Sequence, residues 1–258
     1  MIKNCAKKIY LILIFIFLYA PIFTLIILSF NKSKTRAKWG GFTLKWYTEL
    51  FKNDAIMNAL FNTLMIALIA SVVSTIIGTI ACIAIEAMNS RQRSIVMGIT
   101  NIPMLNAEIV TGISFMLLFI SFGFKFGLGT ILLAHITFCI PYVILSIMPR
   151  MKMLNPYAYE AALDLGASPI YGFIKITLPD IAPGIASGFL MAFTMSIDDF
   201  IITHFTKGAG VDTLSTKIYT EVKKGIKPEM YALSTLIFVT VLILLLLINR
   251  TPKEVSKK

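Results

Sequence analysis

The chain has 258 residues, of which 57% are hydrophobic and only 14% charged, and its mean hydropathy is +0.81. Soluble domains carry roughly 45 to 50% apolar and about 25% charged residues, so the composition excludes an ordinary soluble domain and indicates a membrane protein. A formal net charge of +11 would suggest nucleic acid as a partner for a soluble chain. In a chain this apolar it indicates Lys and Arg at helix ends and on anionic lipid headgroups, with no nucleic-acid partner.

Six stretches are long and apolar enough for transmembrane helices, each of which needs about 20 residues to cross roughly 30 Å of hydrocarbon. The predicted spans are 9–30, 60–86, 95–122, 127–149, 181–204 and 230–249. The first is too long for the apolar core of a signal peptide, so we interpret it as a permanent span. No remaining segment is long enough for a soluble domain. We therefore expect an all-α membrane protein with a single transmembrane domain over residues 1–258.

The basic residues leave the orientation of these spans open. With a cytoplasmic N-terminus, the 24 Lys and Arg divide evenly between the two sides, whereas the positive-inside rule requires a cytoplasmic excess. Arg91 and Arg93 lie in the tight turn between the second and third spans, where short flanks carry most weight. They favour a cytoplasmic N-terminus.

The segment 32–58, between the first two spans, contains Trp39, Trp46 and Tyr47 among Gly and Lys. Amphipathic rings of this kind lie at the level of lipid headgroups. We expect an interfacial helix here, which contacts either membrane lipid or a partner protein.

The segment 155–179, between the fourth and fifth spans, carries signals for two short helices. Pro156 suits a first helical turn, and Gly166 is where such a helix would stop. Ser168 then serves as the N-cap of a second helix with Pro169 at its first position, and this helix is expected to run until Leu178-Pro179. The result is a rigid knob outside the hydrocarbon, of a shape that fits a partner's cleft.

This segment also carries a family motif. Glu160-Ala161-Ala162 is followed after three residues by Gly166, and after nine more by Ile176-x-Leu178-Pro179. The pattern resembles the EAA loop of permease subunits in binding-protein-dependent ABC importers and matches it at every fixed position. The resemblance implies a six-span permease of the type I ABC importer architecture, in which residues 155–179, the coupling loop, face the cytoplasm and dock into a groove of the ATPase subunit. The residues that it assigns to this docking are Glu160, Ala161, Ala162, Gly166, Ile176, Leu178 and Pro179.

The same resemblance implies partners. The chain has no GxxxxGK[ST] loop to hold phosphates, so ATP has to bind elsewhere and no cofactor is expected on this chain. A permease of this family pairs with a sister permease, two ATPase subunits and an extracytoplasmic substrate-binding protein. We expect it in a bacterial cell membrane, with its N-terminus in the cytoplasm.

Four further segments point to a narrower group. Residues 41–47, 134–142, 196–200 and 217–219 resemble the second permease of spermidine/putrescine importers. Related importers of other small solutes share parts of these segments. Another small solute therefore stays the alternative cargo.

Three acids lie within the third and fifth predicted spans, where a charge costs about 2.5 to 3.5 kcal/mol on insertion scales and usually faces a cavity or a partner. Glu108 lies past the middle of the third span, and Asp198 and Asp199 lie in the outer part of the fifth. Together they predict an acidic, cation-favouring stretch of the substrate path. The alternatives are that the two aspartates cap the fifth span or pair with Lys207, and that Glu108 forms a buried pair across the subunit interface.

Two other classes of protein fit less well. A secondary transporter or channel often has two repeated halves with interrupted helices, and no internal repeat is visible. Gly112-Ile113-Ser114 with His135 or His204 suggests a serine enzyme only superficially, because a three-residue match is common by chance. We expect a non-catalytic subunit. The scattered cysteines, Cys5, Cys82 and Cys139, are interpreted as apolar fillers rather than disulfides or metal ligands.

Overall fold

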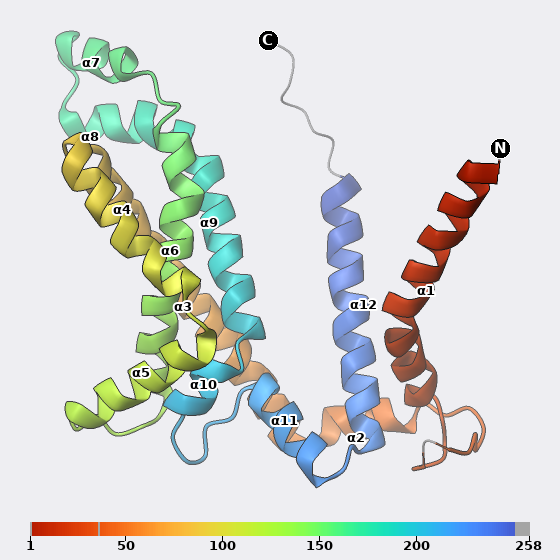
Figure 1. The fold of residues 1–258 in the computed structure, drawn as a ribbon. Helices are drawn as coiled ribbons and strands as arrows, with labels where there is room; N and C mark the ends of the chain where they lie inside the picture. Colours follow the sequence, from red (N-terminus) through yellow and green to blue (C-terminus); the bar gives the residue numbers. More distant parts are fainter. Residues whose placement is uncertain (1, 36, 251–258) are drawn as a thin grey trace. The chain divides into compact units, whose positions relative to one another are not determined.

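The computed structural model describes residues 2–35 and 37–250, and over this part of the chain the architecture is helical (Figure 1). The one β-type pairing that these residues make is an isolated antiparallel bridge between Asn31 and Phe42. The helices are α1 (Ile2–Ser29), α2 (Lys45–Lys52), α3 (Asp54–Glu86), α4 (Ser90–Leu105), α5 (Glu108–Ser121), α6 (Leu128–Met151), α7 (Pro156–Asp164), α8 (Pro169–Gly172), the π-helical turn η1 (Phe173–Thr177), α9 (Leu178–Asp198), α10 (Ile201–Thr206), α11 (Leu214–Lys224) and α12 (Pro228–Arg250).

Several of these helices have the length and composition of membrane spans. Four pass this test among the described residues: Tyr10–Ser29, Asp54–Glu86, Leu128–Met151 and Pro169–Asp198. The bent pair α4 and α5 makes a fifth if it counts as one span. The span expected at 230–249 lies on α12, where the side chains of residue 241 and of residues 243–250 lie outside the described part.

Packing divides the chain into two compact units, one formed by Met1–Met57 with Ile218–Lys258 and the other by Asn58–Lys217. In the first unit, α1 and α2 pack on α12. Trp46 of α2 is 4% exposed, and its indole Nε1 donates to the carbonyl of Asn31 at 2.7 Å. This tryptophan therefore anchors its own loop, whereas Trp39 is 54% exposed and remains free for an interfacial contact.

The centre of the second unit is the antiparallel pair α6 and α9. Small residues recur at every fourth position on the buried face of α9: Gly184, Gly188, Ala192 and Ser196. Each lies against a residue of α6, where the positions descend by four in the opposite direction: Ile147, Val143, Cys139 and His135. Small residues let two helices approach closely where lipid offers no hydrophobic driving force. This packing fixes the register between the two helices.

The pair is close enough to exclude larger side chains. A Cβ atom on Gly188 would lie 3.3 Å from Val143 Cγ1, and one on Gly184 would lie 3.3 Å from Ile147 Cα. A Cβ on Gly78 of α3 would lie 2.6 Å from the same Val143 methyl. Cys82 and Cys139 are buried in this core as free thiols, which agrees with their interpretation as apolar fillers. The side chain of Cys5 lies outside the described residues.

Two predicted spans are interrupted in the structure. The stretch 95–122 is two helices, α4 and α5, that meet at a bend of 103°. Asn106 and Ala107 between them have extended backbone, and Pro103 lies in the last turn of α4. A count of apolar residues does not register these local breaks. Glu108 therefore lies at the first position of α5, at the bend, and not deep within a continuous helix.

The predicted fifth span also begins and ends differently. Helical backbone runs from Pro169 to Asp198, so the second helix of the coupling loop does not stop at Leu178-Pro179. Across the π-helical turn, the N–H of Leu178 donates to the carbonyl of Phe173, and Pro179 follows in the first turn of α9, where a missing N–H is tolerated. At its far end α9 stops at Asp198, and the short α10 follows.

Candidate functional site

The coupling loop is held in shape by local hydrogen bonds at both of its short helices. The side chain of Asn155 caps α7 by accepting from the N–H of Tyr157 at 3.1 Å, with Pro156 at the first helical position. The hydroxyl of Ser168 caps α8 by accepting from the N–H of Tyr171 at 3.3 Å. Both caps satisfy amide donors that a helix start leaves unpaired. The sequence-based prediction of two helices that begin at these positions is confirmed.

Gly166 ends α7 in a left-handed conformation, with φ of +89°. Its N–H donates to the carbonyl of Leu163 at 2.9 Å, and the N–H of Ala167 donates to the carbonyl of Ala162 at 3.0 Å. This pair of bonds is the Schellman termination, which favours glycine because a Cβ in this conformation costs roughly 1 to 2 kcal/mol. No atom lies within 4 Å of the position of a Cβ on Gly166. The requirement for glycine is therefore conformational and not steric.

The two helices of the loop pack on each other through an aromatic ring. A Cβ on Gly172 would lie 3.1 Å from the ring of Tyr159, and the Tyr159 hydroxyl lies 3.5 Å from the carbonyl of Pro169. The outer surface of the loop is nevertheless apolar. Side chains that are between 48% and 90% exposed form what we call the docking face: Tyr157, Leu165, Ile170, Tyr171 and Ile174. An exposed apolar patch of this kind is typical of a contact with a partner protein or with the membrane.

The motif residues of the loop fall into two groups in space. Glu160 of α7 and Ile176 of η1 line the same cavity of about 450 Å³, together with Glu86, Lys152 and Asp180. Ala161 is exposed and Ala162 is half-buried on α7. Leu178 packs against the core of the second unit, and Pro179 is exposed beside it. Glu160 and Ile176, from the two ends of the motif, thus line one cavity, whereas Ala161, Ala162, Leu178 and Pro179 do not.

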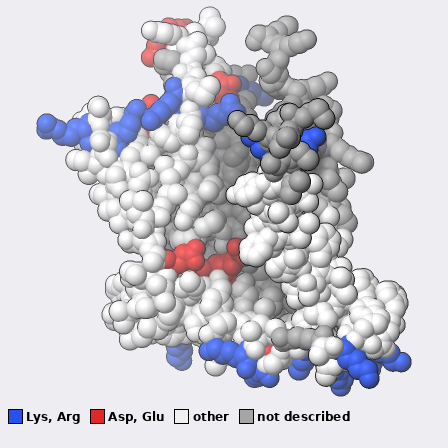
Figure 2. Space-filling view, turned by 45° about the vertical axis from the view of Figure 1, so that its right-hand side comes forward, with Lys and Arg blue, Asp and Glu red and all other residues white. Residues whose placement is uncertain are grey.

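The three acids predicted for the substrate path line a second cavity, of about 260 Å³. They belong to the end of α9 that is far from the coupling loop, near α5 and α10 (Figure 1). Its walls are Glu108, Phe138, Thr194, Met195, Asp198 and Asp199. Carboxylates stand out within an otherwise uncharged stretch of the surface in Figure 2. Glu108 and Asp198 are exposed, each at a break between helices. The structure thus brings residues from α5 and α9 to one polar hollow.

Asp199 differs from its neighbour Asp198. Its side chain is 4% exposed, and both oxygens accept hydrogen bonds: Oδ1 from the N–H of Ile202 at 3.1 Å, and Oδ2 from the N–H and the hydroxyl of Thr203, each at 2.8 Å. Asp199 therefore caps the start of α10. The alternative that the aspartates pair with Lys207 does not hold for Asp199, because the ammonium of Lys207 pairs with Asp212.

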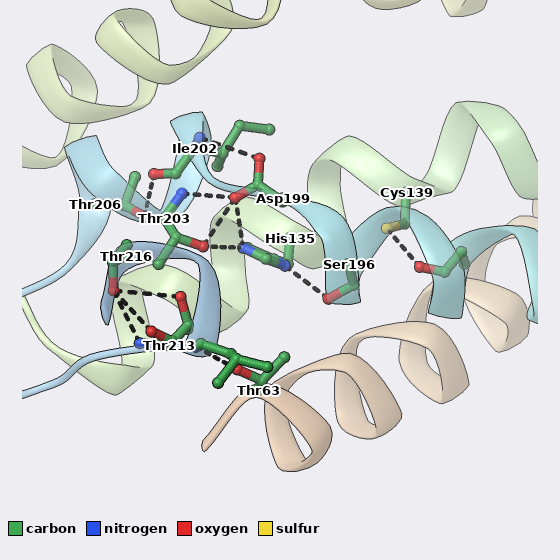
Figure 3. A network of polar contacts seen from close by, with 12 residues as sticks. Thr63, His135, Cys139, Ser196, Asp199, Ile202, Thr203, Thr206, Thr213 and Thr216 are labelled. Carbon is green, nitrogen blue, oxygen red and sulfur yellow. Dashed lines mark hydrogen bonds and ion pairs between the residues drawn. The ribbon is translucent and has the colours of Figure 1, made fainter. Parts of the chain in front are cut away.

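His135 of α6 completes the surroundings of Asp199 (Figure 3). Its Nδ1 lies 2.7 Å from the hydroxyl of Ser196, and its Nε2 lies 2.9 Å from the hydroxyl of Thr203 and 3.3 Å from Asp199 Oδ2. Figure 3 shows the ring between Ser196 on one side and Thr203 and Asp199 on the other. The sequence indicated His135 only as part of a family-like segment and as a superficial partner of Ser114, not as a contact of Ser196. The signal that finds Ser196 as its partner is the small-residue repeat along α9.

Ser196, His135 and Asp199 resemble a Ser–His–Asp triad in composition, but their surroundings differ from those of a catalytic triad. Ser196 is 4% exposed, and His135 is 1% exposed. Neither lines any of the cavities above, and Asp199 is occupied by backbone amides. Ser114 of the GxS match donates to the carbonyl of Val110. The contacts are those of a structural network. Among the described residues no group of three or more His, Cys, Asp or Glu is placed to hold a metal ion.

Comparison with known proteins assigns the chain to a family. Residues 74–250 match the family described as binding-protein-dependent transport system inner membrane component. The chain belongs to this family. It is the membrane-spanning permease component of an ABC importer, and the expected family, helical class and multi-pass inner-membrane location are confirmed.

Similar permeases cover nearly the whole chain. The permease is 35% identical over 244 residues to the spermidine/putrescine transport system permease protein PotC of Escherichia coli strain K12, covering 95% of this chain and 92% of that protein. It is 40% identical over 243 residues to the putrescine transport system permease protein PotI of the same strain, covering 92% and 86%. PotC of Haemophilus influenzae is 36% identical over 241 residues, covering 93% and 94%.

Solved structures share the fold at lower identity. A chain of a bacterial ABC transporter involved in import of the acidic polysaccharide alginate superposes with a TM-score of 0.74 at 14% identity, covering 97% of this permease and 96% of that chain. A chain of an amino acid ABC transporter gives a TM-score of 0.53 at 16% identity, covering 79% and 98%. ABC transporters named for very different solutes thus share this fold, so cargo has to be argued from the site.

Proposed function

We propose that this permease forms, with a sister permease, the membrane path for polyamines of the spermidine and putrescine class. Two ATPase subunits drive transport, and an extracytoplasmic binding protein delivers the cargo. The relatives named for spermidine and putrescine support this cargo, at 35% and 40% identity over most of the chain. The observation that carries the proposal is the polar hollow at the two helix breaks, where Glu108 and Asp198 present exposed carboxylates within apolar spans.

The carboxylates explain how such a path favours a polycation. An ammonium group that leaves water needs a compensating charge, and the carboxylates that line the cavity provide it. Helix breaks suit this purpose, because non-helical backbone at membrane depth is tolerated where it lines a cavity. Glu108 and Asp198 are free to meet cargo, whereas the oxygens of Asp199 are used in capping α10. We therefore assign cargo contact to the first two and a supporting role to Asp199.

The coupling loop transmits the ATPase movement in this proposal. Its docking face would be buried in the groove of the ATPase subunit, and Glu160 would accept a hydrogen bond from a basic side chain or a backbone N–H of that partner. Because the loop continues through η1 into α9 without interruption, a movement at the loop reaches the far end of α9 as a rigid-body displacement. That end carries Asp198 and the break to α10. ATP hydrolysis and the acidic cavity are thereby linked through one helix.

The test of the cargo is uptake of radiolabelled spermidine and putrescine by cells that produce the complete importer. Glu108→Gln removes a charge with little change of volume, so the KM for uptake should rise about tenfold while the level of permease and the basal ATPase stay normal. Glu49→Gln on α2, which loses an exposed carboxylate paired with Lys45, is the matched control and should behave as wild type. Normal KM values for both polyamines in Glu108→Gln contradict the acidic path. Uptake of a different small solute in place of polyamines contradicts the cargo.

Orientation follows from the same proposal and has its own test. The coupling loop faces the cytoplasm and residues 32–58 face outward, which requires a cytoplasmic N-terminus. Single cysteines at Ser168 and Ser33, in a background where Cys5, Cys82 and Cys139 are replaced by Ala, report the two sides. An impermeant thiol reagent added to intact cells should label position 33 and leave position 168 unlabelled. Labelling of position 168 overturns the orientation.

A further inference from the structure

The break between α9 and α10 needs external support. α9 ends at Asp198, Asp199 has extended backbone, and α10 contains only six residues. A helix of this length is not stable by itself, since nucleation costs more than a few hydrogen bonds return. Its position therefore depends on what packs around it. In the second unit α10 packs on α5 and α6.

His135 of α6 touches both sides of the break. It contacts Ser196 on the last turn of α9 at 2.7 Å and Thr203 on α10 at 2.9 Å (Figure 3). A second tie from α6 lies further along, where the hydroxyl of Thr130 donates to the carbonyl of Thr206 at 2.8 Å. Apart from the capping bonds of Asp199, these contacts hold α10 to a helix that is itself fixed on α9 by the small-residue repeat. The histidine is the member that bridges both helices.

The hydrogen bonds around the ring form a consistent set. The hydroxyl hydrogen of Thr203 is donated to Asp199 Oδ2, so its oxygen accepts from His135 Nε2–H. On the other side of the ring, Nδ1 lies 2.7 Å from the hydroxyl of Ser196, which can accept or donate. Both ring nitrogens therefore have hydrogen-bond partners in the network. A buried network that is fully satisfied favours one arrangement of the groups it joins.

The position of α10 in turn determines where the cavity acids lie. α10 meets α5 at Gly112, where a Cβ would lie 3.0 Å from the ring of Phe205 and 3.4 Å from Ile201. Glu108 lies one helical turn before Gly112 on the same helix. Asp198 lies immediately before the break on the other side. Displacement of α10 therefore moves both exposed carboxylates relative to each other.

We infer that His135 is the positioning residue of the acidic cavity: it holds the break between α9 and α10 so that Glu108 and Asp198 face one space, without touching the cargo itself. The inference deepens the proposed function, since the cavity is the proposed cation path. It predicts that His135 affects the affinity of the cavity for cations only by fixing the relative positions of Glu108 and Asp198. Loss of its hydrogen bonds should weaken cation attraction in the cavity even though no charge is removed.

A cysteine reporter in the cavity tests this directly. Thr194 is exposed and lines the cavity on α9, so Thr194→Cys in the cysteine-free background can be labelled in the assembled importer in membrane vesicles. The ratio of labelling rates for a cationic and a neutral methanethiosulfonate measures the local negative potential. With His135→Phe, which keeps ring volume but no hydrogen bond, the ratio should fall about fivefold. With His135→Gln, whose amide N–H can replace Nε2–H toward Thr203, most of the ratio should return.

The controls separate positioning from general damage. Thr137→Val, which removes an exposed hydroxyl that bonds only within α6, should leave the ratio unchanged. If His135→Phe and His135→Gln both fail to accumulate in the membrane, Ser196→Ala and Thr203→Val each remove one contact of the ring and are expected to lower the ratio instead. An unchanged ratio in His135→Phe at normal level, or in both of these variants, overturns the inference.

A third arm separates this inference from the proposed function. Glu108→Gln with Asp198→Asn should abolish the cation preference at position 194. If that double variant keeps the preference while His135→Phe still changes the rate with the neutral reagent, the positioning role stands and the acidic path fails. If the double variant loses the preference and His135→Phe changes neither rate, the path stands and the positioning role fails.

Discussion

The coupling loop and the acidic cavity lie at opposite ends of α9, and they are built in different ways. In the loop, each cap and turn is made by residues within a few positions of each other, such as Asn155 with Tyr157 and Ser168 with Tyr171. In the cavity, the decisive contacts join residues more than sixty positions apart, as in His135 with Ser196. The loop is thus shaped by local backbone chemistry, and the cavity by the register of two packed helices.

Because the cavity depends on the register of the two helices, we expect the largest effect from a substitution between them. Gly188→Leu places a large side chain where a Cβ already lies 3.3 Å from Val143, and overpacking of this kind costs roughly 1 to 3 kcal/mol or more. The folded permease should be largely lost from the membrane, as measured by its detergent-extracted level and by its thermal stability. Gly98→Leu, on the exposed face of α4 with open space around it, is the matched control and should accumulate normally. Equal levels of the two variants contradict the importance of the helix register.

A smaller effect is expected from a change within the loop. Gly166→Ala has room for its methyl group but must adopt a φ of +89°, which costs roughly 1 to 2 kcal/mol. The permease should insert normally, while retention of the ATPase on purification falls about fivefold. Gly123→Ala carries the same kind of strain at a φ of +69°, in a turn after α5 that is also open. If it lowers ATPase retention as much as Gly166→Ala does, the loop has no special role in coupling.

The two regions also differ in how far the sequence predicts them. The break at Gly166 and the caps at Asn155 and Ser168 follow from residue types at fixed spacings, and the structure has them where they were expected. The continuation through Pro179 was missed, because a π-helical turn has no sequence signature of its own. Four of the predicted stretches coincide with helices of spanning length among the described residues, since about 20 apolar residues favour such helices.

For the cavity, the sequence predicted the acidic residues but not their arrangement. Glu108, Asp198 and Asp199 stand out as charges in apolar stretches, and they do line one cavity. That cargo moves past these acids remains a prediction. The sequence does not separate Asp198 from Asp199, because which of two adjacent carboxylates is buried depends on the bend that starts α10 and on His135 from another helix. The breaks at residues 106–107 and 199–200 were likewise not predicted, because the predicted spans 95–122 and 181–204 run through both.

The comparison of Asp198→Asn with Asp199→Asn in spermidine uptake tests the central claim most directly. In Asp199→Asn the amide oxygen can still accept from Thr203, and only the bond from the N–H of Ile202 is lost, so α10 should largely keep its place and the KM should rise by no more than about threefold. Asp198→Asn removes an exposed carboxylate from the cavity, and its KM should rise about tenfold, which corresponds to roughly 1.4 kcal/mol. Both variants have to be measured at matched permease levels. A larger rise in KM for Asp199→Asn than for Asp198→Asn would contradict the division of roles proposed for these two neighbours.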